Sequence, residues 1–227
     1  DSRVRITPQL IRVADDTHVW ADRYDRVLAD VLAMQSEVAE NAVKAMGVTL
    51  LPRERTALNE IPTKDMEAYD LYLQGKELAA RGTLKSDVEG AFEAFRAAAD
   101  RDPRFAQALA GLAKMHLSMY WFYYDRSPER LVRAKEAAER AVELRPDLTE
   151  SHIALAWYFY AGLLDYPRAL DELAVARRIQ PNSSAVHELT GYALRRQGRW
   201  EEAAAAMRAA LELDPKNTNV LGNLTET

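Results

Sequence analysis

The first fifty residues follow two different patterns of apolar and polar positions. From residue 3 to residue 10 the two kinds of side chain alternate, which is typical of a half-buried strand. Pro8 interrupts this strand and favours a place at the edge of a sheet, because proline has no N–H to donate. We expect a turn at residues 15–18 and a returning strand at residues 19–24. The apolar members of the first strand are Val4, Ile6 and Leu10.

The spacing of apolar residues then becomes helical. Asp30 suits the N-cap of a helix of about 15 residues, and Gly47 suits its C-terminal end. The predicted apolar face contains Val31, Met34, Val38, Ala42 and Met46. Residues 51–65 form a connector, in which Pro52 could open a short helix that runs to Asn59.

The rest of the chain is organised by four prolines. They are Pro103, Pro146, Pro181 and Pro215, which are 43, 35 and 34 residues apart. A recurring period near 34 indicates tandem pairs of helices, since each proline must lie beyond a helix end.

Small residues recur at fixed distances before these prolines. Alanine stands five residues and twelve residues before every one of them, where two helices can approach closely. Eight residues before each proline stands a larger or helix-favouring residue that can fill space between pairs. The two sets are Ala98, Ala141, Ala176, Ala210, Ala91, Ala134, Ala169 and Ala203, and Phe95, Ala138, Leu173 and Met207.

These residues resemble the tetratricopeptide repeat family. The best-matching unit has Gly191 at the small position of its first helix, a turn at residues 197–200 and Pro215 at its end. The first unit matches least well, with Ala79 at its small position. The resemblance implies a mainly α fold, an α-α superhelix of about four helix pairs. The expected units span about 72–105, 106–148, 149–183 and 184–217, with a partial fifth unit at 218–227 inside an array at 66–227. The second unit is about nine residues too long, and the third has one extra residue near 162–164.

Residues 1–50 resemble the end of a TolB-like α/β domain. The resemblance rests on residues 3–6, on Gln9-Leu10 and on residues 18–25. Such domains precede tetratricopeptide arrays in bacterial adenylate/guanylate cyclase-like proteins and CadC-like transcriptional regulators. We therefore expect a β-hairpin and helix that are the remnant of a larger domain, with earlier strands upstream of residue 1. The hairpin could also pair with a second copy to form a homodimer.

Composition narrows the chemistry of the segment. The formal net charge is −5, which argues against binding of nucleic acid by these residues. Cysteine is absent, and no apolar run is long enough to span a bilayer. The four histidines show no metal-ligand spacing, and we find no phosphate loop or nucleophile motif. We predict no catalytic residue, metal or cofactor in this segment, and a bacterial origin with the cytoplasm and the periplasm both open.

The expected function is binding of a protein or peptide in the concave groove lined by the first helix of each pair. The alternatives are that the segment is the non-catalytic C-terminal part of a nucleotide cyclase or of a CadC-like regulator. The family resemblance places in the groove Lys76, Gln107, Lys114, Trp157, Tyr160, Glu188, Tyr192 and Arg195. The competing interpretation is a solvated helix face with a few packed aromatic residues.

A run of five aromatic residues at 120–124 occupies the long second unit. They cannot all face one side of a helix. One interpretation is a contact patch for a partner, formed by Tyr120, Trp121, Tyr123 and Tyr124. The other is an extended helix whose aromatic side chains pack on the next unit around Trp157 and Phe159.

Overall fold

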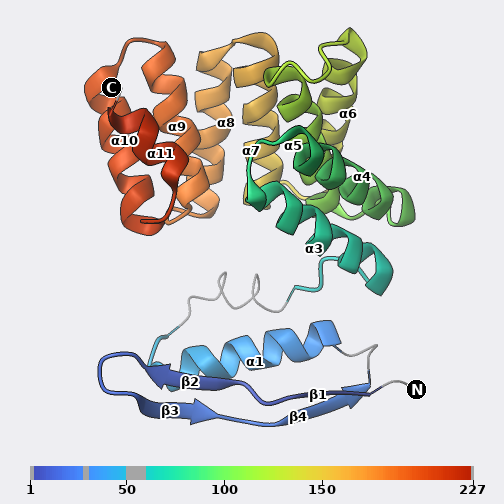
Figure 1. Cartoon of the computed structure of the whole chain (residues 1–227), viewed down its shortest axis with the longest axis vertical. Helices are drawn as coiled ribbons and strands as arrows, with labels where there is room; N and C mark the ends of the chain where they lie inside the picture. Colours follow the sequence, from blue (N-terminus) through green and yellow to red (C-terminus); the bar gives the residue numbers. More distant parts are fainter. Residues whose placement is uncertain (1–2, 28–30, 50–59, 226–227) are drawn as a thin grey trace. The chain divides into compact units, whose positions relative to one another are not determined.

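Figure 1 shows a computed structural model of the chain, which describes residues 3–27, 31–49 and 60–225. The chain forms two compact units, Asp1–Met66 and Glu67–Thr227. The predicted helix from Pro52 and the predicted Asp30 cap lie outside the described residues.

The first compact unit contains a long antiparallel hairpin that is interrupted once. Its outer ladder pairs β1 with β4, and its inner ladder pairs β2 with β3. The interruption falls at Pro8, as expected for a residue without an N–H, and the Pro8 carbonyl instead accepts a hydrogen bond from the Asp22 N–H at 3.3 Å. The four strands are Arg3–Ile6, Gln9–Arg12, Thr17–Ala21 and Tyr24–Val27.

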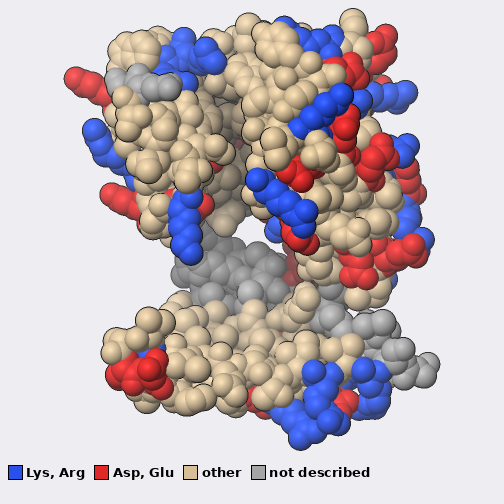
Figure 2. Space-filling view, viewed as in Figure 1, with Lys and Arg blue, Asp and Glu red and all other residues tan. Residues whose placement is uncertain are grey.

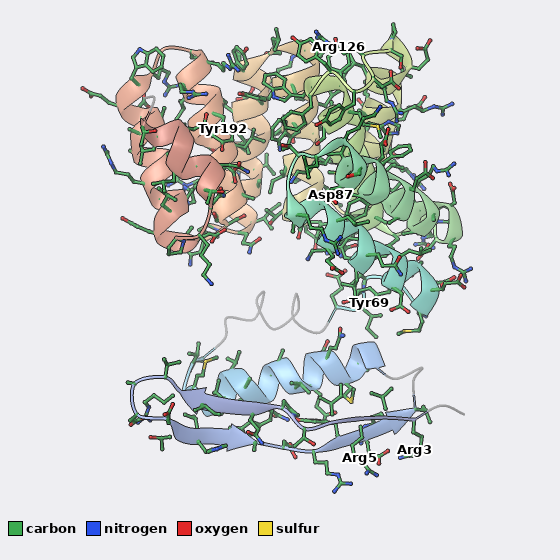
Figure 3. The ribbon with its side chains drawn as sticks, viewed as in Figure 1. Arg3, Arg5, Tyr69, Asp87, Arg126 and Tyr192 are labelled. Carbon is green, nitrogen blue, oxygen red and sulfur yellow. The ribbon has the colours of Figure 1, made fainter. Side chains whose placement is uncertain are left out.

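The hairpin turn lies about two residues earlier in the chain than predicted. Thr17 and His18 belong to β3, so the turn lies at 13–16, where Asp16 adopts a left-handed φ of 54°. Across the outer ladder, Asp25 of β4 forms ion pairs with Arg3 at 2.7 Å and Arg5 at 2.9 Å, and both arginines project from β1 in Figure 3. Their hydrogen bonds lower the pKa of the Asp25 carboxyl.

One helix, α1 (Val31–Ala45), packs on the hairpin. Met34 of its predicted apolar face is buried together with Tyr24 of β4. The Asn41 amide donates a hydrogen bond to the Tyr24 hydroxyl at 2.8 Å, which satisfies the one polar group of that ring. Met46 lies beyond the end of the helix and is exposed, and Gly47 adopts a left-handed φ of 70°, the conformation expected just past a helix.

The second compact unit is an array of paired helices, as predicted. The pairs are α3 (Met66–Arg81) with α4 (Lys85–Arg101), α5 (Ala106–Trp121) with α6 (Pro128–Leu144), α7 (Thr149–Trp157) and π-helical η2 (Tyr158–Leu163) with α8 (Tyr166–Ile179), and α9 (Ser184–Arg196) with α10 (Trp200–Leu213), followed by α11 (Thr218–Thr225). In Figure 1 successive pairs lie side by side along the array.

The recurring small residues form the contacts between these helices. All eight alanines of the predicted set are 0% exposed. At Gly191, a Cβ would lie 2.7 Å from Met207 Cγ and 3.2 Å from the Ala203 carbonyl oxygen, so α9 approaches α10 too closely for any side chain. The predicted frame of prolines and alanines is therefore the packing frame of the array.

The first repeat unit, formed by α3 and α4, begins earlier than the resemblance suggested. Helix α3 starts at Met66, and its close approach to α4 falls at Gly75, where a Cβ would lie 2.8 Å from the Phe95 ring. Ala79, the residue predicted for this role, is only partly buried. The error arose because counting from Tyr72 placed the small position one helical turn too late.

The extra length of the second repeat unit, formed by α5 and α6, is spread over three places. Helix α5 has 16 residues where α9 has 13, and α6 has 17 where α10 has 14. The connection at 122–127 takes up the remaining difference. This unit is therefore taller than a regular one, and it carries a longer loop at one edge of the array.

The single extra residue of the third unit appears as a π-helix. Residues 158–163 form η2, and Leu164 ends it with a left-handed φ of 55°. A π-helical turn is the local form that an α-helix takes when one residue is inserted into it. The irregularity lies where the sequence placed the extra residue.

Candidate functional site

The first helices of successive pairs lie next to one another on one side of the array. Helix α5 packs against α7, and α7 packs against α9. Figure 2 shows the array hollowed between α9–α11 on one side and α3–α5 on the other, with charged side chains gathered mainly on the outer rims. We call this hollow the groove.

Lys114, one of the predicted groove residues, belongs to α5. Its side chain is exposed to solvent, yet the surrounding protein removes enough water from it to lower the pKa of its amine. The Glu188 carboxylate on α9 opposes this shift, which places the two charges within electrostatic reach across the groove. An exposed side chain with protein on most sides is what a concave surface produces.

Glu188 is held by two hydrogen bonds. The Tyr192 hydroxyl donates to one of its oxygens at 2.9 Å, and the Asn217 amide donates to the other at 2.9 Å. Burial of the ring and the nearby carboxylate both raise the pKa of Tyr192, which Figure 3 marks on α9. This side of the groove is therefore a fixed polar surface.

The other predicted groove residues differ in how far they reach solvent. Lys76 is exposed, and its amine lies 5.7 Å from the centroid of the Tyr72 ring, while Gln107, Trp157 and Arg195 are partly buried. Tyr160 is only 3% exposed, so it belongs to the core and not to the groove surface. Whether the exposed members bind a partner remains a prediction.

The aromatic run is partly buried and partly exposed. Trp121 ends α5 and packs against Tyr160 at a centroid distance of 5.6 Å, and Tyr124 packs near the buried Phe95 and Met119. Tyr123 is 75% exposed and adopts a left-handed φ of 63°. Part of the run is thus core, and part of it lies on the surface of the long loop.

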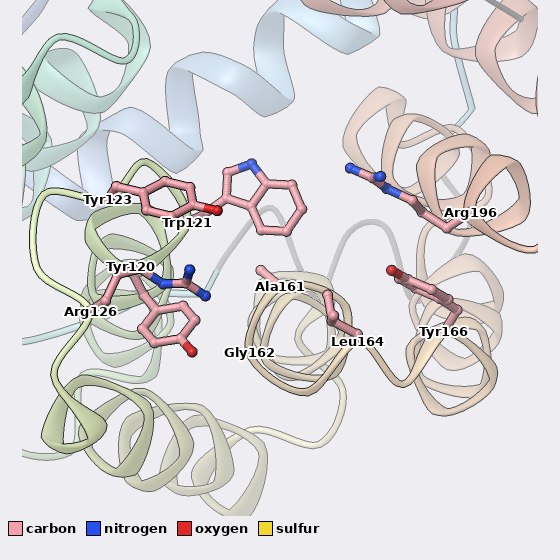
Figure 4. Close-up of a pocket in the computed structure, with 9 residues that line it drawn as sticks. All are labelled: Tyr120, Trp121, Tyr123, Arg126, Ala161, Gly162, Leu164, Tyr166 and Arg196. Carbon is pink, nitrogen blue, oxygen red and sulfur yellow. The ribbon is translucent and has the colours of Figure 1, made fainter.

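Beside this loop lies a pocket of about 490 Å³, which we call the edge pocket (Figure 4). It is formed at the ends of α5, η2 and α9, by the loop at 122–127 and by the start of α8. It is lined by Tyr120, Trp121, Tyr123, Arg126, Ala161, Gly162, Leu164, Tyr166 and Arg196. Sequence reasoning identified the aromatic run but missed Arg126, Tyr166 and Arg196, because nothing in the sequence shows that they meet.

Two histidines form buried polar contacts. In His152, Nδ1 lies 2.7 Å from a Glu172 oxygen and Nε2 lies 3.0 Å from the Pro146 carbonyl, so both ring nitrogens face acceptors and the pKa is raised. In His116, burial beside Arg130 lowers the pKa to about 4, and Nδ1 lies 3.1 Å from that guanidinium. His152 therefore joins the loop before α7 to α8, and neutral His116 joins α5 to α6.

Among the described residues, no group of three or more histidine, aspartate or glutamate side chains is arranged to hold a metal ion. No helix in the described part of the chain is both long and apolar enough to cross a membrane.

Comparison with known proteins agrees with the repeat architecture. Residues 184–217 match the family model described as tetratricopeptide repeat. A crystal structure of a thermophilic TPR protein from Thermus thermophilus superimposes with a TM-score of 0.58 at 20% identity, covering 87% of this chain and 97% of that one. PilF of Pseudomonas aeruginosa superimposes with a TM-score of 0.51 at 21% identity, covering 70% of this chain and 67% of PilF.

Two curated relatives are much longer proteins. A Rhizobium meliloti (strain 1021) protein named "Putative adenylate cyclase 3" is 32% identical over 172 residues, which are 75% of this chain and 28% of the relative. Anaphase-promoting complex subunit 3 of Dictyostelium discoideum is 26% identical over 102 residues, which are 45% of this chain and 10% of the relative. The helix-pair array of Glu67–Thr227 thus has the fold of tetratricopeptide repeat proteins, and its residues 184–217 match the model of that family.

Proposed function

We propose that the array binds a peptide or helix of another protein in the groove. The observation that carries this proposal is Lys114, an exposed cation of α5 that surrounding protein partly desolvates and that lies within electrostatic reach of Glu188 on α9. Among the residues that the structure describes, Lys114 makes no ion pair within 4 Å. A carboxylate of a partner would supply the missing counterion in a place where water screens the attraction less than it does on a convex surface.

The groove also sets the chemistry of the partner. Trp157 on α7 and Tyr192 on α9 offer partly buried ring surface, and aromatic side chains are common anchors of protein interfaces. The matching partner is a segment that alternates carboxylate and apolar side chains, in an extended or a helical form.

A display library of acidic and apolar peptides, selected on the full chain, tests this proposal. We expect selected peptides to lose affinity by about tenfold or more in Lys114→Ala, since a charge-assisted contact contributes on the order of 1.5–3 kcal/mol. Fluorescence anisotropy measures the affinity. Lys135→Ala is the matched control, because this lysine lies on α6 and pairs with Glu139 at 3.6 Å. Peptides that bind Lys114→Ala and the wild type equally well would contradict groove binding.

We further propose that the chain is the regulatory or sensory arm of a larger bacterial signalling protein. The support is the likeness to the longer Rhizobium protein and the resemblance of residues 1–50 to the end of a TolB-like domain. The alternatives are the C-terminal part of an adenylate or guanylate cyclase, or of a CadC-like regulator. The gene sequence preceding residue 1 distinguishes them: metal-binding aspartates of a cyclase favour the first, and a winged-helix pattern favours the second.

We also propose that the hairpin forms a second interface. Ile11, Val13 and Val19 on or between β2 and β3 are exposed, with Val13 at 94%. Pairing with a second copy through this apolar surface would make the chain a homodimer. Light scattering on the wild type and on Val13→Asp should then show a dimer that becomes a monomer. A monomer in both samples would contradict pairing.

A further inference from the structure

Two of the segments that line the edge pocket are places where the array departs from a regular repeat. The long loop of the second unit supplies Tyr123 and Arg126, and the π-helical end of the third unit supplies Ala161, Gly162 and Leu164. Tyr123 and Leu164 both adopt left-handed φ angles, which cost free energy for residues other than glycine. Strained residues and π-helical turns gather at functional sites, so their meeting in one pocket indicates more than a packing irregularity.

Two arginines face this pocket without a carboxylate partner. The Arg126 guanidinium lies between the Tyr120 and Tyr123 rings, 4.5 Å from each centroid. Arg196 lies 5.6 Å from the centroid of the Trp121 ring, and its Nε lies 3.4 Å from the Tyr160 hydroxyl. Within the described part of the chain neither arginine forms an ion pair, whereas other exposed arginines such as Arg140 and Arg199 pair with a neighbouring glutamate.

The lining thus combines two positive charges with flat apolar walls. Figure 4 shows Arg126 and Arg196 reaching toward the pocket from opposite sides, with Trp121 between them and Tyr166 beside Arg196. None of the described residues that line it is an aspartate or a glutamate. Rings hold both guanidinium groups in place, so little side-chain freedom remains to be lost when an anion binds. A volume of about 490 Å³ is in the range of sites for small molecules.

We propose that the edge pocket binds a small planar anion, namely an aromatic or heteroaromatic ring that carries a carboxylate or a phosphate. The ring stacks on the aromatic walls, and the anionic group accepts hydrogen bonds from Arg126 and Arg196. This site is separate from the groove, because its lining residues come from helix ends and loops while Lys114 lies within α5. Its test is therefore independent of the peptide experiment.

Calorimetric titration of the full chain with matched probes tests the proposal. Adenosine 5′-monophosphate and indole-3-acetate each carry a ring and an anion; adenosine and indole carry the ring alone, and ribose 5-phosphate and acetate the anion alone. We expect at least one complete probe to bind with a Kd on the order of 10–100 µM, and its two partial probes to bind about tenfold or more weakly. The phosphate and carboxylate arms identify which anion the pocket prefers.

Variants connect the binding to the pocket. Arg126→Gln and Arg196→Gln should each weaken binding of the complete probe by about tenfold or more. Both side chains are exposed, so their melting temperatures should stay close to that of the wild type. Arg208→Gln on α10 is the control and should bind as the wild type does. The proposal is overturned if no complete probe binds at about 5 mM, if a partial probe binds equally well, or if the two arginine variants retain full affinity.

Discussion

The fourth repeat unit and the two units before it use the same frame in different ways. Residues 184–217 form two helices of 13 and 14 residues with short connections, and this is the segment that matches the family model. The second and third units keep the buried alanines but add length at one edge. That edge carries the long loop, the π-helix and the edge pocket.

This difference distinguishes the residues that form the repeat scaffold from the residues that form features specific to the longer units. In the fourth unit the buried residues Gly191 and Met207 serve contact between helices. In the longer units, large aromatic residues fill the added space, and Tyr160 contacts Trp121, Trp157 and Tyr166. Insertions at an edge leave the packing between units intact, so they can add a site without disturbing the fold.

The largest effect is expected at the centre of the aromatic cluster. Tyr160→Ala should reduce the free energy of unfolding by about 3–5 kcal/mol, because it opens a cavity among three rings. Tyr123→Ala, at a residue 75% exposed, should change it by less than about 0.5 kcal/mol. Chemical denaturation measures both, and a cost below about 1 kcal/mol at Tyr160 would show that the cluster is not part of the core.

Adding a single methyl group at Gly191 should destabilise the fourth repeat unit. Gly191→Ala places a Cβ against Met207 and the Ala203 carbonyl, and overpacking of this kind costs about 1–3 kcal/mol. Gly222→Ala is the same change in α11, where nothing lies within 4 Å, and it should stabilise the protein by up to about 1 kcal/mol. Equal effects at the two glycines would mean that close helix approach is not what requires Gly191.

The strain at the edge pocket can be tested by relieving it. Leu164→Gly should stabilise the protein by about 0.5–1 kcal/mol, because glycine adopts a left-handed φ without the penalty that leucine carries. Leu163→Gly, in the π-helix and similarly exposed, should instead destabilise by about 1 kcal/mol. Thermal melts of the two variants should therefore move in opposite directions, and a loss of stability in both would argue against strain at Leu164.

A smaller, pH-dependent effect is expected at His152. Its contact with Glu172 raises its pKa in the folded protein, so the stabilisation is fully present below the unfolded pKa of about 6.5 and is lost as the pH rises through the folded value. The stability difference between wild type and His152→Gln should therefore be larger at pH 6 than at pH 9.

His187 provides the control for this measurement. It occupies the equivalent place in α9, and its Nε2 lies 3.0 Å from the Pro181 carbonyl, but in the described structure it has no carboxylate partner. His187→Gln should show a smaller dependence on pH. A difference at His152 that grows toward high pH would contradict the assignment of a charged histidine.

The buried frame could be predicted from the sequence, and the surfaces could be predicted only in part. Prolines and alanines at fixed distances located eight fully buried positions of the second helices, because the period of a repeat can be read from the sequence. The family resemblance assigned Tyr160 to the groove, which assumes a regular α-helix at this position. The π-helical turn changes how successive side chains rotate about the axis, and Tyr160 is buried.

The edge pocket was beyond sequence reasoning for a different reason. Arg126 and Arg196 are 70 positions apart, and each alone resembles an ordinary exposed arginine. Only the stacking of three units brings them to one pocket. The available signals were indirect: five aromatic residues in a row, and units longer than their neighbours.

Hydrogen exchange of the full chain, with and without a peptide selected on it, tests the proposed function most directly. Binding in the groove predicts slower exchange in α5, α7 and α9, including the segments around Lys114 and Glu188, with little change in α4, α6 and α8. Protection confined to the second helices, or to the hairpin of the first unit, would contradict the assignment of the groove as the binding surface.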